Sequence, residues 1–354
     1  MLFRMIRFAD KLCRMVSRCL VALLAVLCPC VHAQQSTQPF YLVSPNAKGA
    51  LVIPYDADWK ISGLSLYDHG TRPAVQLDKA KSPLVLSLIL FPNASSQPDP
   101  TNCREDVLQP LNQRFGNLIQ RGSWRRSEQT TPSGARLALA SYVLTIAPNP
   151  QIAEIAGVKP LDTNFFAFTA TPAVCAEMHV SSATDKPMPI DQLQALLPKF
   201  QFQPDYEPRS SDYAKLGALL YRAAKDYTSA AVYYQRAWDT LPPDDPQHAM
   251  LFRYLTDQLA MSYGMSGDLA KSRAVNQAAI ARDPEYPLYY YTLACADAEE
   301  GNAAAARTHL QQAFDRRANT LPGEKMPDPT HDDSIVKLKH DKAFWQFVQT
   351  LPQS

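Results

Sequence analysis

Small and apolar residues recur with a helical period between residues 212 and 316, in three units that can be aligned with one another. The units span residues 214–242, 254–284 and 288–314, and in the latter part of each a short turn is followed by an alanine-rich run. Apolar positions three and four residues apart predict helices, so the pattern predicts three pairs of antiparallel helices. The matched positions are Ala218, Ala260 and Ala294; Ala230, Ser272 and Ala306; Tyr234, Asn276 and Leu310; and Ala237, Ala279 and Ala313.

The spacing of the units is nearly regular. Ala279 and Ala313 are 34 residues apart, whereas Ala237 and Ala279 are 42 apart. The additional residues fall around 243–250, where an Asp-Pro pair would start a longer first helix. Because two helices approach closely only where side chains are small, we expect a larger residue at Ala279 or Ala313 to overpack the pair, at a cost of about 1–3 kcal/mol.

These features resemble the tetratricopeptide repeat (TPR) family over residues 212–316 or so. The 34-residue spacing is the period of that family, and Pro242 and Pro284 close the first two units. The usual Leu-Gly pair of the first helix is replaced by Gly217-Ala218, Leu259-Ala260 and Leu293-Ala294. The resemblance implies an all-α solenoid that docks a protein or peptide partner on a concave surface lined by the first helix of each unit.

The phase of the repeats implies which side chains line that surface. The set includes Met side chains, which adapt readily to a bound peptide. The lysine and asparagine clamp of some TPR domains is not evident. It is equally open that this surface packs against the first domain or the C-terminal cap. The expected partner-binding residues are Lys215, Leu219, Arg222, Tyr254, Asp257, Met261, Met265 and Tyr291, with Leu288, Cys295 and Glu299 as further positions.

Residues 328–351 are predicted to cap the solenoid. Ile335 and Leu338 form a short apolar face, and Asp341 can N-cap a last helix. The end of a repeat array needs such a cover, because its last apolar face has no neighbour. The last helix carries Phe344, Trp345, Phe347, Val348 and Leu351.

The first domain, residues 36–203, shows a different pattern, in which short alternating or continuously apolar runs predict strands. The expected class is an α+β sandwich with an antiparallel sheet and helices on one side. The order of elements resembles the PsbP-like sandwich, a family that is mainly non-catalytic, with residues 147–163 as an insertion. Residues 204–211, with two prolines, are the predicted linker. The predicted strands are 50–54, 59–61, 74–77, 84–91, 137–146, 165–171 and 174–181, and the predicted helices are 106–120 and 190–200.

The first 33 residues have the pattern of a signal peptide, with a basic start, an apolar core at 19–30 and a small residue, Ala33, before the polar Gln34. Lipidation at Cys28 or Cys30 is the alternative. We therefore expect an exported protein, periplasmic or extracellular if the source is bacterial. No later segment has the run of about 18 apolar residues that a membrane span needs.

Composition and charge narrow the classes of partner that this protein can be expected to bind. The chain is 46% hydrophobic and 19% charged, as globular proteins are. The 35 basic and 34 acidic residues become 30 and 33 without residues 1–33, so the net charge is −3. This balance does not favour a nucleic-acid or anionic-membrane partner.

Three cysteines lie beyond residue 33, namely Cys103, Cys175 and Cys295. Export permits a Cys103–Cys175 disulfide, and two buried thiols are the alternative. Strand alternation puts Cys175, Glu177 and His179 on one face. Together they could bind a metal or form a Cys–His nucleophile, but we expect a polar face that is exposed to solvent.

Two further groups of polar residues are expected at the surface, His331-Asp332-Asp333 and His340. In addition, Asn93-Ala94-Ser95 matches a glycosylation acceptor.

The sequence holds no GxSxG, HExxH, GxGxxG, P-loop or, after residue 33, CxxC motif. We therefore predict no catalytic residues, no metal and no cofactor. The leading hypothesis is an exported, non-catalytic scaffold that acts through its TPR domain. The alternative is an envelope protein that binds a small ligand or metal through the first domain.

Overall fold

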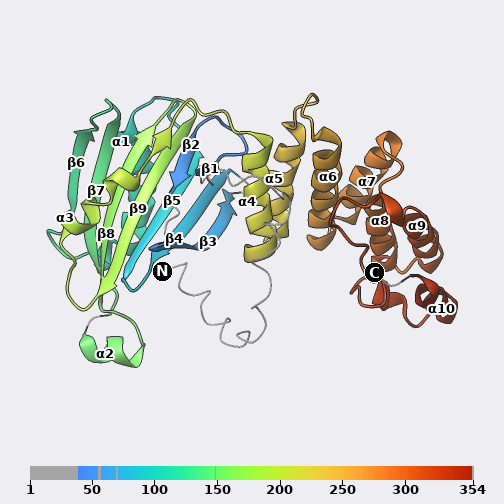
Figure 1. The fold of residues 1–354 in the computed structure, drawn as a ribbon. Helices are drawn as coiled ribbons and strands as arrows, with labels where there is room; N and C mark the ends of the chain where they lie inside the picture. Colours follow the sequence, from blue (N-terminus) through green and yellow to red (C-terminus); the bar gives the residue numbers. More distant parts are fainter. Residues whose placement is uncertain (1–38, 55–56, 69–70, 148, 353–354) are drawn as a thin grey trace. The chain divides into compact units, whose positions relative to one another are not determined.

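A computed structural model describes residues 39–352, apart from 55–56, 69–70 and 148. The predicted signal peptide at 1–33 lies outside the described residues. Within them, no helix is both long and apolar enough to cross a membrane. An antiparallel β region comes first and a helical region follows it (Figure 1), as the sequence predicts.

The β region contains a seven-stranded and a three-stranded sheet, both entirely antiparallel. The large sheet has the order β3-β4-β5-β9-β8-β7-β6, and the small sheet has the order β1-β2-β10. In the large sheet the strands are β3 (Trp59–Tyr67), β4 (Arg72–Lys79), β5 (Leu84–Pro92), β6 (Arg125–Thr130), β7 (Arg136–Thr145), β8 (Leu161–Ala170) and β9 (Val174–Thr184). In the small sheet they are β1 (Phe40–Val43), β2 (Ala50–Ile53) and β10 (Phe202–Gln203).

Both faces of the large sheet are covered, and the prediction that helices cover one side only is wrong. Helix α1 (Pro100–Phe115) packs on the face that carries Phe166 and Cys175. Helix α3 (Ile190–Gln194) and the small sheet pack with the opposite face, which carries Ala176 and Met178. The central strand β9 is therefore buried on both faces, with consequences for its polar residues.

Several elements depart from the sequence prediction, and for two of them the reason is simple. Helix α1 begins six residues before the predicted start at 106, because Asp99 caps it by accepting a 3.0 Å bond from the amide of Thr101. Strand β6 was not predicted, since all six of its side chains are exposed and it carries no apolar residue. The predicted insertion contains a short helix, α2 (Pro150–Ile155).

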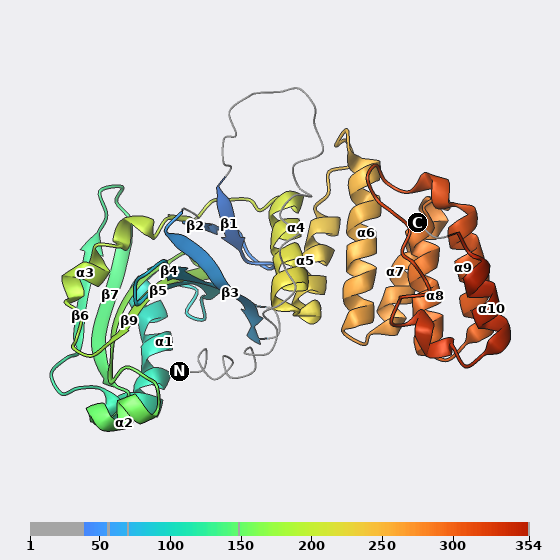
Figure 2. The same cartoon turned by 60° about the horizontal axis from the view of Figure 1, so that its bottom comes forward.

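The helical region consists of antiparallel pairs followed by a cap (Figure 2). The first helix of the second pair has 18 residues and that of the third has 13, which absorbs much of the irregular spacing. The pairs are α4 (Ser210–Leu219) with α5 (Tyr227–Asp239), α6 (His248–Met265) with α7 (Leu269–Arg282), and α8 (Pro287–Glu299) with α9 (Ala303–Asp315). A π-helical turn (Leu220–Ala224) extends α4, and the 3-10 turns η7 (Arg317–Asn319) and η8 (Ile335–Leu338) precede α10 (Lys342–Thr350).

The matched small residues lie where the helices of each pair meet. Ala230, Ser272 and Ala306 are all buried, and so are Ala237, Ala279 and Ala313. The turn inside each pair is also repeated, since Asp226, Asp268 and Asn302 each cap the second helix through the amide three residues on. The residue before each cap has a positive φ: Lys225 (57°), Gly267 (87°) and Gly301 (76°).

Candidate functional site

The first helices of the repeats carry the predicted partner-binding residues, and we call this set the inner face: Lys215, Leu219, Arg222, Tyr254, Asp257, Met261, Met265 and Tyr291. Its first part is open to solvent. Met261 is 36% exposed and Met265 is 55% exposed, and both lie on α6. Lys215 and Arg222 are exposed, and Leu219 and Tyr254 are half-buried. The open part therefore combines apolar side chains with two cations.

The rest of the inner face is covered by the chain's own residues 320–334, which we call the C-terminal segment. The hydroxyl of Tyr286 donates to Glu324 at 2.8 Å and 2.9 Å, to one and the other carboxylate oxygen. The hydroxyl of Tyr291 donates to Asp332 at 3.3 Å. Beneath the segment, Asp257 is only 6% exposed and Tyr291 only 4%. The structure thus buries these two predicted partner-binding residues, and neither is available to a partner in this conformation.

Contacts at both ends hold the C-terminal segment in place. On the N-terminal side, Arg253 of α6 donates to the carbonyl of Asn319 at 3.4 Å. On the C-terminal side, Lys337 in η8 pairs with Glu299 of α8 at 2.5 Å. Between them, Met326 and Pro329 are buried. The segment therefore has polar contacts and apolar anchors, as a bound peptide would.

Burial under the segment changes the acid–base properties of the groups it covers. Loss of solvent raises the pKa of Asp257 to about 7, and the nearby Glu324 carboxylate adds to the effect. The pKa of Cys295 is also raised, by burial first and then by Asp332, which lies 3.8 Å from its sulfur. His331, Asp333 and His340 are exposed, as predicted, whereas Asp332 is half-buried and contacts Tyr291 and Cys295.

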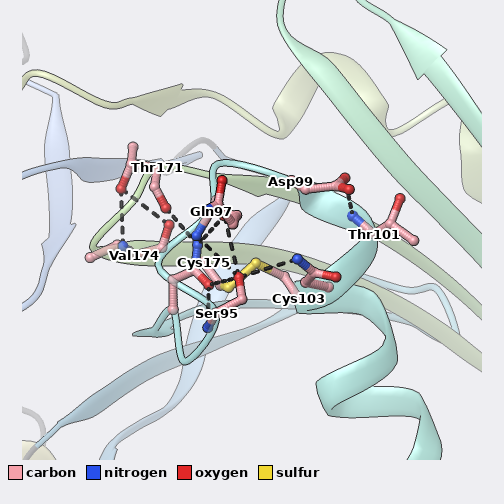
Figure 3. The surroundings of a disulfide bond; sticks show 10 residues. Ser95, Gln97, Asp99, Thr101, Cys103, Thr171, Val174 and Cys175 are labelled. Atoms are coloured by element: carbon pink, nitrogen blue, oxygen red, sulfur yellow. Dashed lines mark hydrogen bonds between the residues drawn. A yellow bond between two sulfur atoms is a disulfide. The ribbon is translucent and has the colours of Figure 1, made fainter.

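A disulfide bond joins Cys103 of α1 to Cys175 of β9 (Figure 3), which is the pairing that the sequence left open. The bond links α1 covalently to β9, the central strand of the large sheet. Close to it, the buried Asn93 donates from its amide nitrogen to the carbonyls of Gln97 (2.6 Å) and Thr171 (2.7 Å). A glycan could be attached there only after these bonds were broken, so the acceptor motif at Asn93 is enclosed in this fold.

The prediction that Glu177 faces solvent is wrong, because α1 covers this part of the sheet, whereas His179 is half-buried. Glu177 is 4% exposed, and burial raises its pKa to about 7 although Arg72 opposes the shift. His179 stacks on Phe166 with ring centres 4.2 Å apart, and its Nε2 lies 2.8 Å from Asn164 Oδ1. Burial lowers the pKa of His179 to about 4, so it is neutral at physiological pH.

The trio of Cys175, Glu177 and His179 does not form the metal site or nucleophile that the sequence left open. Cys175 has no free thiol, because it is bonded to Cys103. Among the described residues, no three His, Cys, Asp or Glu side chains are placed to hold a metal ion together.

A cleft of about 470 Å³ lies at one end of the β region. Its wall combines apolar rings with hydroxyl groups and one cation, Arg136, which already pairs with Glu128 at 3.2 Å. This cleft could not be predicted from sequence patterns, since the residues that form it are far apart along the chain. They include Pro98, Pro100, Ser133, Leu137, Phe200 and Phe202.

No family model and no curated protein matches this chain. Among solved structures, it is similar to the TPR domain of Sgt2 from Aspergillus fumigatus, with 18% identity and a TM-score of 0.29, covering 42% of this chain and 92% of that one. The C-terminal TPR-containing domain of an FK506-binding protein from Plasmodium falciparum gives 16% identity and a TM-score of 0.29, covering 40% and 90%. A protein from Bacteroides thetaiotaomicron has 10% sequence identity and a TM-score of 0.29, and the match covers 63% of this chain and 78% of that one.

Sequence identities and TM-scores as low as these do not support any conclusion about function. The description of the helices as TPR-like pairs therefore rests on the matched buried residues and repeated caps of this chain. The resemblance of the β region to the PsbP-like sandwich stays a prediction.

Proposed function

We propose that this protein is a non-catalytic scaffold that docks a partner protein on the open part of the inner face. The observation that carries the proposal is the exposure of Met261 and Met265, one turn apart on α6. They are the large apolar side chains of the described helical region that remain exposed. Exposed unbranched apolar side chains suit an adaptable peptide contact.

The charges on the open part of the inner face favour a particular type of partner. Lys215 and Arg222 lie on the neighbouring first helix and are exposed. Acidic side chains of a partner would be attracted to them, and the methionines would receive its apolar side chains. Because only part of the inner face is open, we expect a short contact of modest affinity.

A photocrosslinking amino acid at Met265 tests this proposal in the source cells. The matched control is the same amino acid at Gln277, which is exposed on the second helix α7. We expect one defined protein adduct at Met265 that is absent at Gln277. It should weaken when Met261→Lys is added. Equal adducts at both positions, or none at Met265, would contradict the proposal.

The 470 Å³ cleft supports a second candidate function, in which the β region binds a small molecule. Its volume lies within the usual range for ligand sites. A ligand-observed NMR screen of small aromatic carboxylates would test it, with Ser133→Trp as the variant that fills the cleft. Binding that this variant leaves unchanged would place the ligand elsewhere.

We also propose that the protein is exported. The pattern of residues 1–33 motivates this, and the Cys103–Cys175 disulfide supports it, because disulfides persist in oxidising compartments. The N-terminal sequence of the purified native protein should start at Gln34. A native chain that still begins at Met1 in a reducing compartment would refute export.

A further inference from the structure

The C-terminal segment, residues 320–334, contacts the helices without forming regular secondary structure of its own. It runs between η7 and η8, and no helix or strand is formed within it. Its contacts come from side chains that an extended peptide would present. Glu324 and Asp332 accept hydrogen bonds from tyrosine hydroxyls. Met326, which lies between them in the sequence, is buried.

The surface of the helices that contacts the segment presents tyrosine hydroxyls to its carboxylates. Tyr286 and Tyr291 lie on or next to α8, five residues apart, and each points a hydroxyl at a carboxylate. Tyrosine rings supply a rigid apolar contact with a polar end. Arg253 also donates to the carbonyl of Asn319, at the segment's N-terminal flank. Beyond the segment's C-terminal end the direction is reversed, because Glu299 of α8 accepts from Lys337. Within the segment, Glu324 and Asp332 each accept from a hydroxyl on the helices, an arrangement that favours acidic side chains at these two positions.

The composition of the segment is acidic, in agreement with these contacts. Its sequence, TLPGEKMPDPTHDDS, contains four acidic residues and one lysine, so its net charge is −3 with histidine neutral. Its three prolines keep the backbone extended and disfavour a helix. The open part of the inner face carries two exposed cations, Lys215 and Arg222.

From these contacts we propose that the C-terminal segment is a tethered ligand of the inner face, and that the partner is an extended acidic peptide that competes with it. The inference rests on the proposed function, and it specifies the partner's chemistry: two carboxylates that flank an apolar side chain. The tether holds the segment at an effective concentration of the order of millimolar. A segment of weak intrinsic affinity therefore occupies the face until a partner that binds more strongly replaces it.

A labelled peptide of residues 320–334 tests the inference by fluorescence anisotropy. The protein is the full chain from Gln34, as wild type and as a variant in which residues 321–333 are replaced by a glycine–serine linker of equal length. This variant keeps η8 and α10. We expect the peptide to bind the linker variant, and to bind the wild type more weakly by a factor of the order of ten, because the tether competes.

Two controls make the binding specific. A peptide with Glu324→Gln and Asp332→Asn should lose most of its affinity for the linker variant. Adding Tyr286→Phe and Tyr291→Phe to the linker variant should have the same effect on the native peptide. A folded linker variant that does not bind the peptide, or that binds both peptides equally, overturns the inference.

Hydrogen exchange supplies a second measurement if the linker variant does not fold. In the full chain, Glu324→Gln with Asp332→Asn should speed exchange across residues 322–331 about tenfold or more, and leave α6 and α7 unchanged. Unchanged exchange in the segment overturns the inference. The photocrosslink at Met265 does not depend on either result, so failure of the tethered ligand and failure of the proposed function can be told apart.

Discussion

The hydroxyl of Tyr233 in α5 donates a 2.8 Å hydrogen bond to the carbonyl oxygen of Val43 in β1. Both residues are buried, and they are 190 positions apart in the chain. A second, longer bond of 3.4 Å joins the hydroxyl of Tyr213 to the carbonyl of Ser44. The first helix pair and the small sheet therefore share a polar contact inside an apolar cluster.

We expect Tyr233→Phe to lower the free energy of unfolding by about 1–3 kcal/mol, because a buried carbonyl loses a donor. Urea denaturation measures the loss. Tyr290→Phe is the matched control, since its hydroxyl donates to the carbonyl of Pro284 within the helical region. Hydrogen exchange in β1 should rise for Tyr233→Phe only. A similar rise in both variants would show that the bond does not connect the two regions.

Lys225 occupies a position where the other two repeats have glycine, and its φ is 57°. A left-handed backbone costs a non-glycine residue about 1–2 kcal/mol. We expect Lys225→Gly to raise the free energy of unfolding by about 0.5–1 kcal/mol, seen as a higher melting temperature. The reciprocal change, Gly267→Ala, should lower it, although no atom lies within 4 Å of the added Cβ. If both changes had the same sign, backbone strain would not be the cause.

The Cys103–Cys175 bond closes a long loop, with 72 residues of sequence separation. Loop-closure entropy predicts that Cys103→Ser with Cys175→Ser costs about 4 kcal/mol. In the unreduced, denatured chain from Gln34, thiol titration should find one thiol, that of Cys295. Three thiols in protein from the native source would mean that the bond does not form there.

Glu177 makes the stability depend on pH. Its pKa is about 7 in the folded state and 4.5 without burial. Between these values the folded state keeps a proton that the unfolded state has released, so the free energy of unfolding falls as pH rises, by roughly 3 kcal/mol in all. We expect Glu177→Gln to increase the free energy of unfolding, relative to the wild type, by more at pH 8 than at pH 5.

Denaturation at a series of pH values measures this difference between variant and wild type. His179 acts in the opposite direction, since burial lowers its pKa to about 4 and its neutral form is favoured as pH rises. Asp257 acts in the same direction as Glu177. Both groups are present in variant and wild type, so the comparison isolates Glu177. Parallel pH profiles would refute the role of this carboxyl.

The small residues between paired helices can be tested within one helix. Ala313 is fully buried in α9, whereas Ala304 in the same helix is exposed. We expect Ala313→Leu to cost about 1–3 kcal/mol by overpacking, and Ala304→Leu to change stability by less than about 0.5 kcal/mol. Equal effects would mean that close packing does not limit this position.

Local patterns of the sequence were sufficient for the helical repeats. Small residues at matched positions act within a few residues of chain, so their spacing predicts three helix pairs. The structure adds that Asp226, Asp268 and Asn302 cap the second helix of each pair. The capping role of Asp341 was equally local: it accepts a 2.9 Å bond from the amide of Phe344. The antiparallel class of the first domain also followed, from the alternation of apolar residues.

Contacts between distant segments were decided only by the tertiary structure. Strand alternation put Cys175, Glu177 and His179 on one face, but only the packing of α1 buried Cys175 and Glu177 there. The C-terminal segment has no periodic pattern, so its sequence did not reveal that Glu324 and Asp332 meet Tyr286 and Tyr291. Periodicity reports which face of an element is apolar. What covers that face depends on chain segments brought together by folding. Here residues 320–334 cover part of a surface for which the sequence left two alternatives, open to a partner or packed against the rest of the chain.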